Sequence, residues 1–287
     1  MVIKIKKLHI FIIALITLVI TFGAEFRPDS IITSYSPSEI KLPIVMYHQI
    51  SKSDKNLGDY VLSYETLESD LAYLKNEGYT AITTEDLINF FHNGSDLPEK
   101  CVILTFDDGF ESVNQYVLPL LKKYDMKAVA SVVGSFADAF TQAPDNNVKY
   151  AYMNWDTIAE LVKSPYVEIQ NHTYDMHKRT ADRNGVKIKK DETVDAFRAI
   201  LSDDLLKFQN KMKDITGYSP TAFTYPYGTV SDEGEAIIKE LGFKAAFTCQ
   251  EKINILSRDN PEKLFRLNRF NRPEYVSTEA FFERITI

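Results

Sequence analysis

Val102-Ile-Leu-Thr-Phe106-Asp-Asp-Gly109 is the stretch of sequence that decides the fold. An apolar run rich in β-branched residues ends at two aspartates and a glycine, which is typical of a strand that runs into a turn. Similar short apolar runs lie along the chain at 44–47, 80–83, 128–133, 167–170, 222–225 and 244–248.

Amphipathic stretches separate these runs and have recognisable helix ends. One begins at Ser63 and stops at Gly78, another begins at Ser231 and closes at Gly242, and the longest covers about 192–216. Strands that alternate with helices predict a parallel sheet. We therefore expect one α/β domain, a barrel or an open wound sheet, with its active site at the carboxyl ends of the strands.

The composition narrows the classes of function. Of the 287 residues, 45% are apolar and 25% are charged, and 11 Gly and 11 Pro exclude collagen-like and disordered chains. The net charge of −7, without a basic run in the body of the chain, argues against a nucleic-acid partner. Two cysteines, Cys101 and Cys249, are too few for a disulfide scaffold or a thiolate zinc cluster.

The amino-terminal segment has the pattern of an export signal. Lys4, Lys6 and Lys7 precede an apolar run at 8–22. At about 15 residues the run is shorter than a comfortable membrane span. We therefore predict a signal peptide or an N-terminal membrane anchor at 1–24.

The rest of the chain divides at residue 42. Residues 25–41 contain prolines and several serines and predict a tether, and 42–287 form the predicted catalytic domain. This organisation predicts a monomer that is secreted or held at the extracellular face of the cell membrane.

Polar residues with catalytic chemistry follow several predicted strands. They are His48, Asp107, Asp108, His172, His177 and the turn at 225–228. In a parallel sheet these residues converge on one rim. This convergence argues for an active site more strongly than any single motif does.

Two histidines and two aspartates on one rim favour a divalent metal. Asp107 and Asp108 alone could be a turn with a helix cap. One carboxylate with two imidazoles, however, leaves the open position of a catalytic site, most simply zinc. The second carboxylate can then act as general base on metal-bound water.

The two later histidines are five residues apart. On an ideal helix, residues i and i+5 diverge by about 140°. His172 and His177 can therefore share an ion only on an irregular loop. The alternative is that they are two unrelated loop histidines.

Three motifs together resemble the polysaccharide deacetylases of carbohydrate esterase family 4. They are Thr105-Phe-Asp-Asp-Gly109, Asn171-His-Thr-Tyr-Asp-Met-His177 and Tyr225-Pro-Tyr-Gly228. The resemblance covers about residues 42–275. It implies a distorted (β/α)7 barrel fold and an enzyme that removes N-acetyl groups from amino-sugar polymers. The resemblance also implies one divalent metal, most simply zinc, with cobalt, nickel and iron as alternatives.

The resemblance also implies roles for individual residues. Asp107 would be the catalytic base, and Asp108, His172 and His177 would be the metal ligands. The backbone N–H of Tyr227 would help to hold the oxyanion.

The chain departs from the common family pattern in three places. That pattern spaces the histidines by four residues, has an arginine before the prolines of its third motif, and has a late histidine as general acid. Here the spacing is five, the third motif lacks the arginine, and no histidine follows His177.

These departures are similar to the biofilm branch of the family, the poly-N-acetylglucosamine deacetylases. In that branch the acid histidine comes early, which would give the role to His48 in Leu42-Pro-Ile-Val-Met-Tyr-His48. Arg269 matches the late arginine of the branch and would hold Asp107, with Arg266 as the alternative.

The implied function is N-deacetylation of a cell-surface polymer. The favoured substrate is poly-β-1,6-N-acetyl-D-glucosamine, and peptidoglycan or chitin oligomers are the alternatives. A non-catalytic sugar-binding protein on the same fold is the alternative of another class. Such a protein would be expected to have lost Asp107 or a ligand, and here the full set is present.

Overall fold

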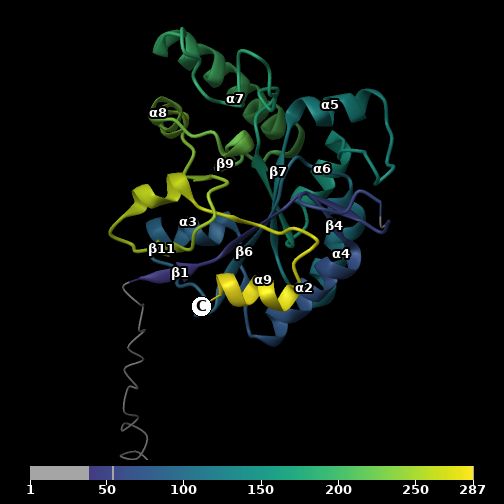
Figure 1. The fold of residues 1–287 in the computed structure, drawn as a ribbon. Helices are drawn as coiled ribbons and strands as arrows, with labels where there is room; N and C mark the ends of the chain where they lie inside the picture. The colour runs from purple at the N-terminus through teal and green to yellow at the C-terminus, as the bar shows by residue number, and fades with distance from the viewer. Residues whose placement is uncertain (1–38, 54, 287) are drawn as a thin grey trace, which may run out of the picture. The chain divides into compact units, whose positions relative to one another are not determined.

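The computed structural model describes residues 39–53 and 55–286, which form one compact unit (Figure 1). The predicted signal or anchor at 1–24 lies outside the described residues, as do residues 25–38 of the predicted tether. Among the described residues, no helix is long and apolar enough to cross a membrane.

A parallel sheet runs through the centre of the unit (Figure 1). Its strand order is β10-β9-β8-β7-β6-β2-β12, and β5 also pairs with β6. Every pairing in this sheet is parallel. The strands are β2 (Ile44–Tyr47), β5 (Thr80–Ala81), β6 (Cys101–Phe106), β7 (Ala128–Val132), β8 (Val167–Asn171), β9 (Ala222–Thr224), β10 (Ala245–Phe247) and β12 (Phe270–Asn271).

The last part of the chain links the two ends of this sheet. Just before β12, the N–H of Leu267 donates to Ala246 of β10 at 2.9 Å, and Thr248 donates back to Leu267 at 2.8 Å. The sheet therefore curls toward closure. The predicted α/β fold with a parallel, distorted barrel is confirmed.

Smaller sheets border the central one. The strands β1 (Ile40–Leu42) and β11 (Asn254–Leu256) pair antiparallel. The strands β3 (Gln49–Ser51) and β4 (Val61–Ser63) pair parallel. The sequence prediction missed all four, and β12 as well.

Helices follow most strands, as the alternating pattern predicts. Ser63 caps α2 through Thr66, Ser231 caps α8 through Gly234, and Gly217, with φ 74°, ends α7. The helices are α2 (Tyr64–Asn76), α3 (Thr84–His92), α4 (Leu118–Tyr124), α5 (Gly134–Gln142), α6 (Trp155–Val162), α7 (Val194–Thr216), α8 (Asp232–Glu240) and α9 (Thr278–Ile285), with the short helical segments η1 (Val113–Val117), η2 (Pro226–Gly228) and η3 (Pro261–Arg266).

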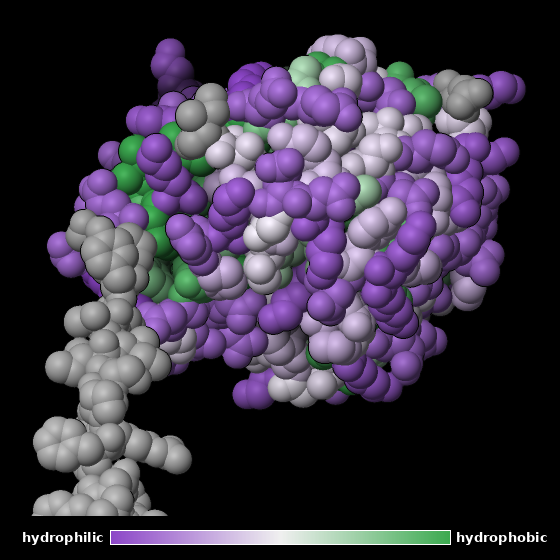
Figure 2. All heavy atoms as spheres, turned by 90° about the horizontal axis from the view of Figure 1, so that it is seen from below, coloured by the Kyte–Doolittle hydropathy of each residue, from purple (hydrophilic) through white to green (hydrophobic). Residues whose placement is uncertain are grey.

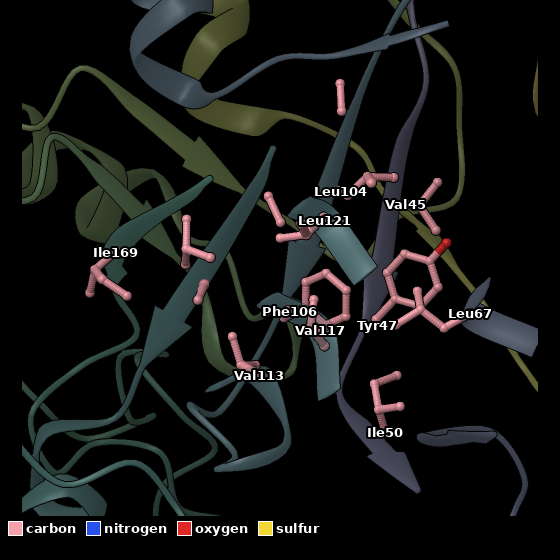
Figure 3. Close-up of a cluster of buried hydrophobic side chains, with 14 of the residues drawn as sticks. Val45, Tyr47, Ile50, Leu67, Leu104, Phe106, Val113, Val117, Leu121 and Ile169 are labelled. Atoms are coloured by element: carbon pink, nitrogen blue, oxygen red, sulfur yellow. The ribbon is translucent and has the colours of Figure 1, made fainter. Parts of the chain in front are cut away.

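The core forms on both faces of the sheet because successive strand residues point in opposite directions. Val45, Tyr47, Leu104 and Phe106 belong to one buried cluster, together with side chains of α2 and α4, as Figure 3 shows. Their neighbours Ile44 and Ile103 belong to a second buried cluster. The side of the molecule seen in Figure 2 is covered mainly by hydrophilic residues, with some hydrophobic ones at its left. Packing on both faces of the sheet holds the carboxyl ends of its strands in place, and the candidate site lies at these ends.

Candidate functional site

The polar residues singled out in the sequence lie at the carboxyl ends of neighbouring strands. His48 follows β2, Asp107 and Asp108 follow β6, and His172 follows β8. Together with His177 they line one cavity of about 380 Å³. The cavity is further lined by Met46, Gln49, Tyr60, Val61, Phe110, Arg179, Tyr227 and Cys249.

Asp108, His172 and His177 form a tight cluster in this cavity. Asp108 Oδ1 lies 3.5 Å from Nε2 of His172 and 3.2 Å from Nε2 of His177. One possible ligand atom from each of the three residues lies within 4.8 Å of the other two. Oδ1 is buried and has no hydrogen-bond partner among the described residues. A carboxylate oxygen and two imidazole nitrogens that converge in this way fit a divalent cation of the zinc type.

Both imidazoles are oriented through their other ring nitrogen. His172 Nδ1 lies 2.8 Å from the carbonyl oxygen of Thr224, which can only accept, so Nδ1 carries the proton. His177 Nδ1 lies 3.3 Å from the hydroxyl of Tyr227. Burial and the neighbouring His172 lower the pKa of His177 to about 4, which keeps the ring neutral at neutral pH, with one nitrogen free to bind a cation. Such contacts behind metal-binding histidines fix ring direction and tautomer.

The loop that carries the two histidines is irregular, as their spacing predicts. Residues 172–177 form no helix, and Thr173 has φ 75°. This turn brings the two imidazole rings to a centroid distance of 4.7 Å.

Asp107 is clamped by a buried guanidinium. Arg269 donates from Nη1 and Nη2 to the two carboxylate oxygens, at 2.7 and 2.8 Å. Arg269 is fully buried and Asp107 is 2% exposed. Burial alone would raise the pKa of Asp107, but the charge and hydrogen bonds of Arg269, together with the nearby His172 and His48, outweigh it and hold the pKa well below its usual range.

The structure separates the two arginines that the sequence left as alternatives. Arg269 also donates to the carbonyl oxygen of Thr248 at 2.8 Å, which fixes its side chain toward Asp107. Arg266 is half exposed and forms ion pairs with Asp232 and Glu235 of α8.

His48 faces the cavity from the end of β2. Its ring meets the Tyr60 ring edge-on at a centroid distance of 4.9 Å. Burial lowers the pKa of His48. Its Nδ1 is buried and has no hydrogen-bond partner among residues 39–53 and 55–286.

Tyr227 lies on the η2 turn beside the cluster. Its ring is 4.6 Å from that of His177 and 4.3 Å from the guanidinium of Arg179. The next residue, Gly228, has φ 65°, and a Cβ there would lie 2.8 Å from Cβ of Cys249. Glycine therefore allows this turn to pack against Cys249.

Backbone strain concentrates at the site. Asp108, Thr173 and Tyr227 have φ of 72°, 75° and 58°, and they are three of the five non-glycine residues with positive φ in the described chain. Such conformations persist where surrounding contacts enforce them, and they cluster at functional sites.

Sequence reasoning missed several residues that line the cavity. Tyr60, Phe110 and Arg179 come from loops and carry no motif. The only available signal was proximity in sequence, since Arg179 follows His177 by two residues.

Comparison with known proteins gives a consistent result. The family model described as "Polysaccharide deacetylase" matches residues 94–246. A poly-beta-1,6-N-acetyl-D-glucosamine N-deacetylase of Escherichia coli (strain K12) is 27% identical over 205 residues, which cover 64% of this chain and 30% of that protein. A protein of the same name from Staphylococcus aureus (strain MRSA252) is 26% identical over 200 residues, which cover 70% of this chain and 65% of that protein.

The fold is also found among solved structures. The Streptococcus pyogenes deacetylase PplD in complex with acetate superposes with a TM-score of 0.68 at 24% identity, covering 86% of this chain and 98% of that one. At this level of identity the likeness shows the fold.

Proposed function

This chain belongs to the polysaccharide deacetylase family, and from that premise we propose that it hydrolyses N-acetyl groups of a polymer of N-acetylglucosamine, most simply poly-β-1,6-N-acetyl-D-glucosamine. One observation carries the proposal: a candidate metal cluster and an arginine-clamped carboxylate lie side by side in one cavity. The curated relatives bear that activity in their names, and the matched part of the chain spans 65% or less of their length.

The donor set fits one divalent cation. Asp108, His172 and His177 would hold it, with zinc as the simplest choice and cobalt, nickel or iron as alternatives. When bound, such a cation supplies Lewis acidity that polarises a carbonyl and lowers the pKa of a water.

Asp107 is our proposed general base. Its two hydrogen bonds from Arg269 keep the carboxylate ionised and fix its orientation. It can therefore accept a proton from a water that attacks the acetamide carbonyl.

His48 is our proposed general acid. It lines the same cavity as Asp107, and the charges of both aspartates act on it. Burial lowers the pKa of His48, so the resting ring is neutral, and it can protonate the leaving amine only after it has taken up a proton in the cavity.

Tyr227 is our proposed oxyanion donor. The positive φ of Tyr227 turns the backbone of η2 beside the metal cluster. A backbone N–H in that place would stabilise charge that develops on the carbonyl oxygen.

We further propose that the protein acts as a monomer, secreted or at the extracellular face of the membrane. The polymer named in its relatives lies outside the cell, and the sequence pattern at 1–24 is that of an export signal.

Acetate release tests the proposal. The purified chain is incubated with poly-N-acetylglucosamine, acetylated peptidoglycan and chitin oligomers, and free acetate is measured. We expect the fastest release from poly-N-acetylglucosamine, loss of activity after chelation, and recovery with zinc or cobalt.

Other outcomes favour the alternatives. Release only from peptidoglycan or chitin oligomers would assign the same chemistry to another polymer. No release from any of the three by metal-loaded protein would contradict hydrolysis and favour a sugar-binding role.

A further inference from the structure

The loop between the two site histidines is held from outside the cavity by one carboxylate. Asp204 of α7 accepts the backbone N–H of Tyr174 through Oδ1 and that of Asp175 through Oδ2, both at 2.7 Å. These two residues are the middle pair of the four that separate His172 from His177. A single side chain thus binds the centre of the loop twice.

The loop needs such support because its backbone is strained. Thr173 is β-branched and has φ 75°, a conformation that such residues rarely adopt. Its N–H donates to Oδ1 of Asn171 at 2.7 Å, and its carbonyl accepts from Gly134 at 3.1 Å. These contacts fix the start of the loop, and Asp204 fixes the residues that follow.

The position of Asp204 on α7 is set by packing. Leu201 and Phe208, three residues before and four after it, are fully buried, so Asp204 lies along the buried face of the helix. The ammonium of Lys207, on the same helix, lies 3.9 Å from the Tyr174 ring centre. Two side chains of α7, three residues apart, therefore contact this loop.

Asp204 does not line the cavity and forms no hydrogen bond with His172, His177 or Asp108 in the described structure. Any effect on these three residues must pass through the loop backbone.

We propose that Asp204 is a positioning residue for the metal site. By pinning Tyr174 and Asp175 it holds the imidazoles of His172 and His177 at the separation at which both reach Asp108. The inference rests on the metal site proposed above.

The test is zinc affinity in Asp204→Ala. The substitution leaves two N–H groups without their acceptor and frees the loop to relax. Loss of groups that orient metal ligands typically costs 10–100-fold in affinity. We expect zinc to bind at least about 10-fold more weakly, measured by competition with a chromophoric chelator. We also expect a changed visible spectrum of the cobalt-loaded protein.

Two further variants separate positioning from folding. Asp204→Asn keeps one acceptor oxygen at the same size, so its zinc affinity should fall between those of the wild type and Asp204→Ala. Asp203→Ala removes the neighbouring, exposed carboxylate and should leave affinity and spectrum unchanged. Melting temperatures of the metal-free proteins report whether each variant folds.

The outcomes are distinguishable. If Asp204→Ala and Asp204→Asn bind zinc like the wild type, with the same cobalt spectrum, the positioning role is wrong while the proposed function stands. If the wild type itself binds neither ion, the metal site fails, and this inference fails with it.

Discussion

Two buried aspartate–arginine pairs, each joined by two hydrogen bonds, lie close together in this molecule and have different surroundings. Arg269 forms two hydrogen bonds with Asp107, and Arg272 forms two with Asp70, at 2.9 and 3.0 Å. The two arginines flank the short strand β12. All four side chains are buried.

The pairs differ in what else the carboxylate touches. Asp70 also accepts the hydroxyls of Thr278, at 2.7 Å, and Tyr47, at 3.1 Å, and it lines no described cavity. Asp107 takes hydrogen bonds to its side chain only from Arg269 among the described residues, and it borders the cavity. An ion pair becomes a candidate catalytic device when its carboxylate keeps free lone pairs next to open space.

The largest expected effect is on stability, at the Asp70–Arg272 pair, which borders no described cavity. Arg272→Ala leaves the Asp70 carboxylate buried without its cation, which typically costs about 3–5 kcal/mol of unfolding free energy. Turnover by the folded fraction should be unchanged. Urea denaturation combined with acetate release measures both, and a large fall in turnover of folded protein would erase the contrast between the pairs.

The next largest effect is expected on turnover, when the carboxylate of Asp107 at the cavity is removed. Asp107→Asn removes the proposed base, and turnover should fall by at least about 100-fold. Because Asp108 and both histidines remain, metal content should stay near one per chain. Asp70→Asn is the matched control, and its folded fraction should turn over substrate at the wild-type rate. Loss of metal from Asp107→Asn would mean that Asp107 belongs to the ligand set.

A third test concerns His48, whose neighbour in sequence, Tyr47, contacts the other ion pair. Tyr47 bonds to Asp70, and His48, the next residue, faces the cavity of Asp107. His48→Ala should slow cleavage of the acetamide by about 100-fold. It should slow an acetyl ester much less, because an alkoxide or phenolate leaves with little protonation. Equal losses on both substrates would indicate a packing role for His48.

The smallest expected effect concerns a carboxylate held by neutral donors. Glu168 accepts the backbone N–H groups of Thr84 and Glu85 at the start of α3, at 2.8 and 3.3 Å. Burial raises the pKa of Glu168 from 4.5 to about 7, because the hydrogen bonds from these donors offset only part of its effect. Asp107 shifts the opposite way because of Arg269.

The sign of the pH effect follows from this upward shift. The folded protein binds the proton of Glu168 more tightly than the unfolded chain does, so protonation stabilises the fold. This stabilisation is fully present below the unfolded pKa of 4.5 and is lost as the pH rises through the folded pKa of about 7. Between pH 5 and pH 8, wild type should lose about 2.5 kcal/mol of unfolding free energy relative to Glu168→Gln. Glu160→Gln, at an exposed position, should run parallel to wild type. An equal pH dependence of wild type and Glu168→Gln would contradict the shift.

The strands that carry the site could be predicted because each is a short apolar run that ends at a polar residue. The partner of Asp107 could be narrowed to Arg269, with Arg266 as the alternative, but the residues alone could not decide between them because both lie on one short segment. The choice between them depends on the bridge of Leu267 to β10, a long-range contact. The sequence contained one indication of the Asp70–Arg272 pair that was not used. Asp70 lies three residues after Leu67 and four before Leu74, on the apolar face of α2, where a charged side chain needs a partner.

The closure of the sheet by its last strand has a consequence for the order in which the site becomes complete. His48, both aspartates and both histidines are synthesised before Arg269, which reaches Asp107 only when the segment around Leu267 and β12 docks between β10 and β2. A nascent or translocating chain that has not yet delivered this segment would hold the candidate metal ligands but not the clamp on the proposed base. Full activity would then appear only after this segment has docked, later than the metal ligands are in place.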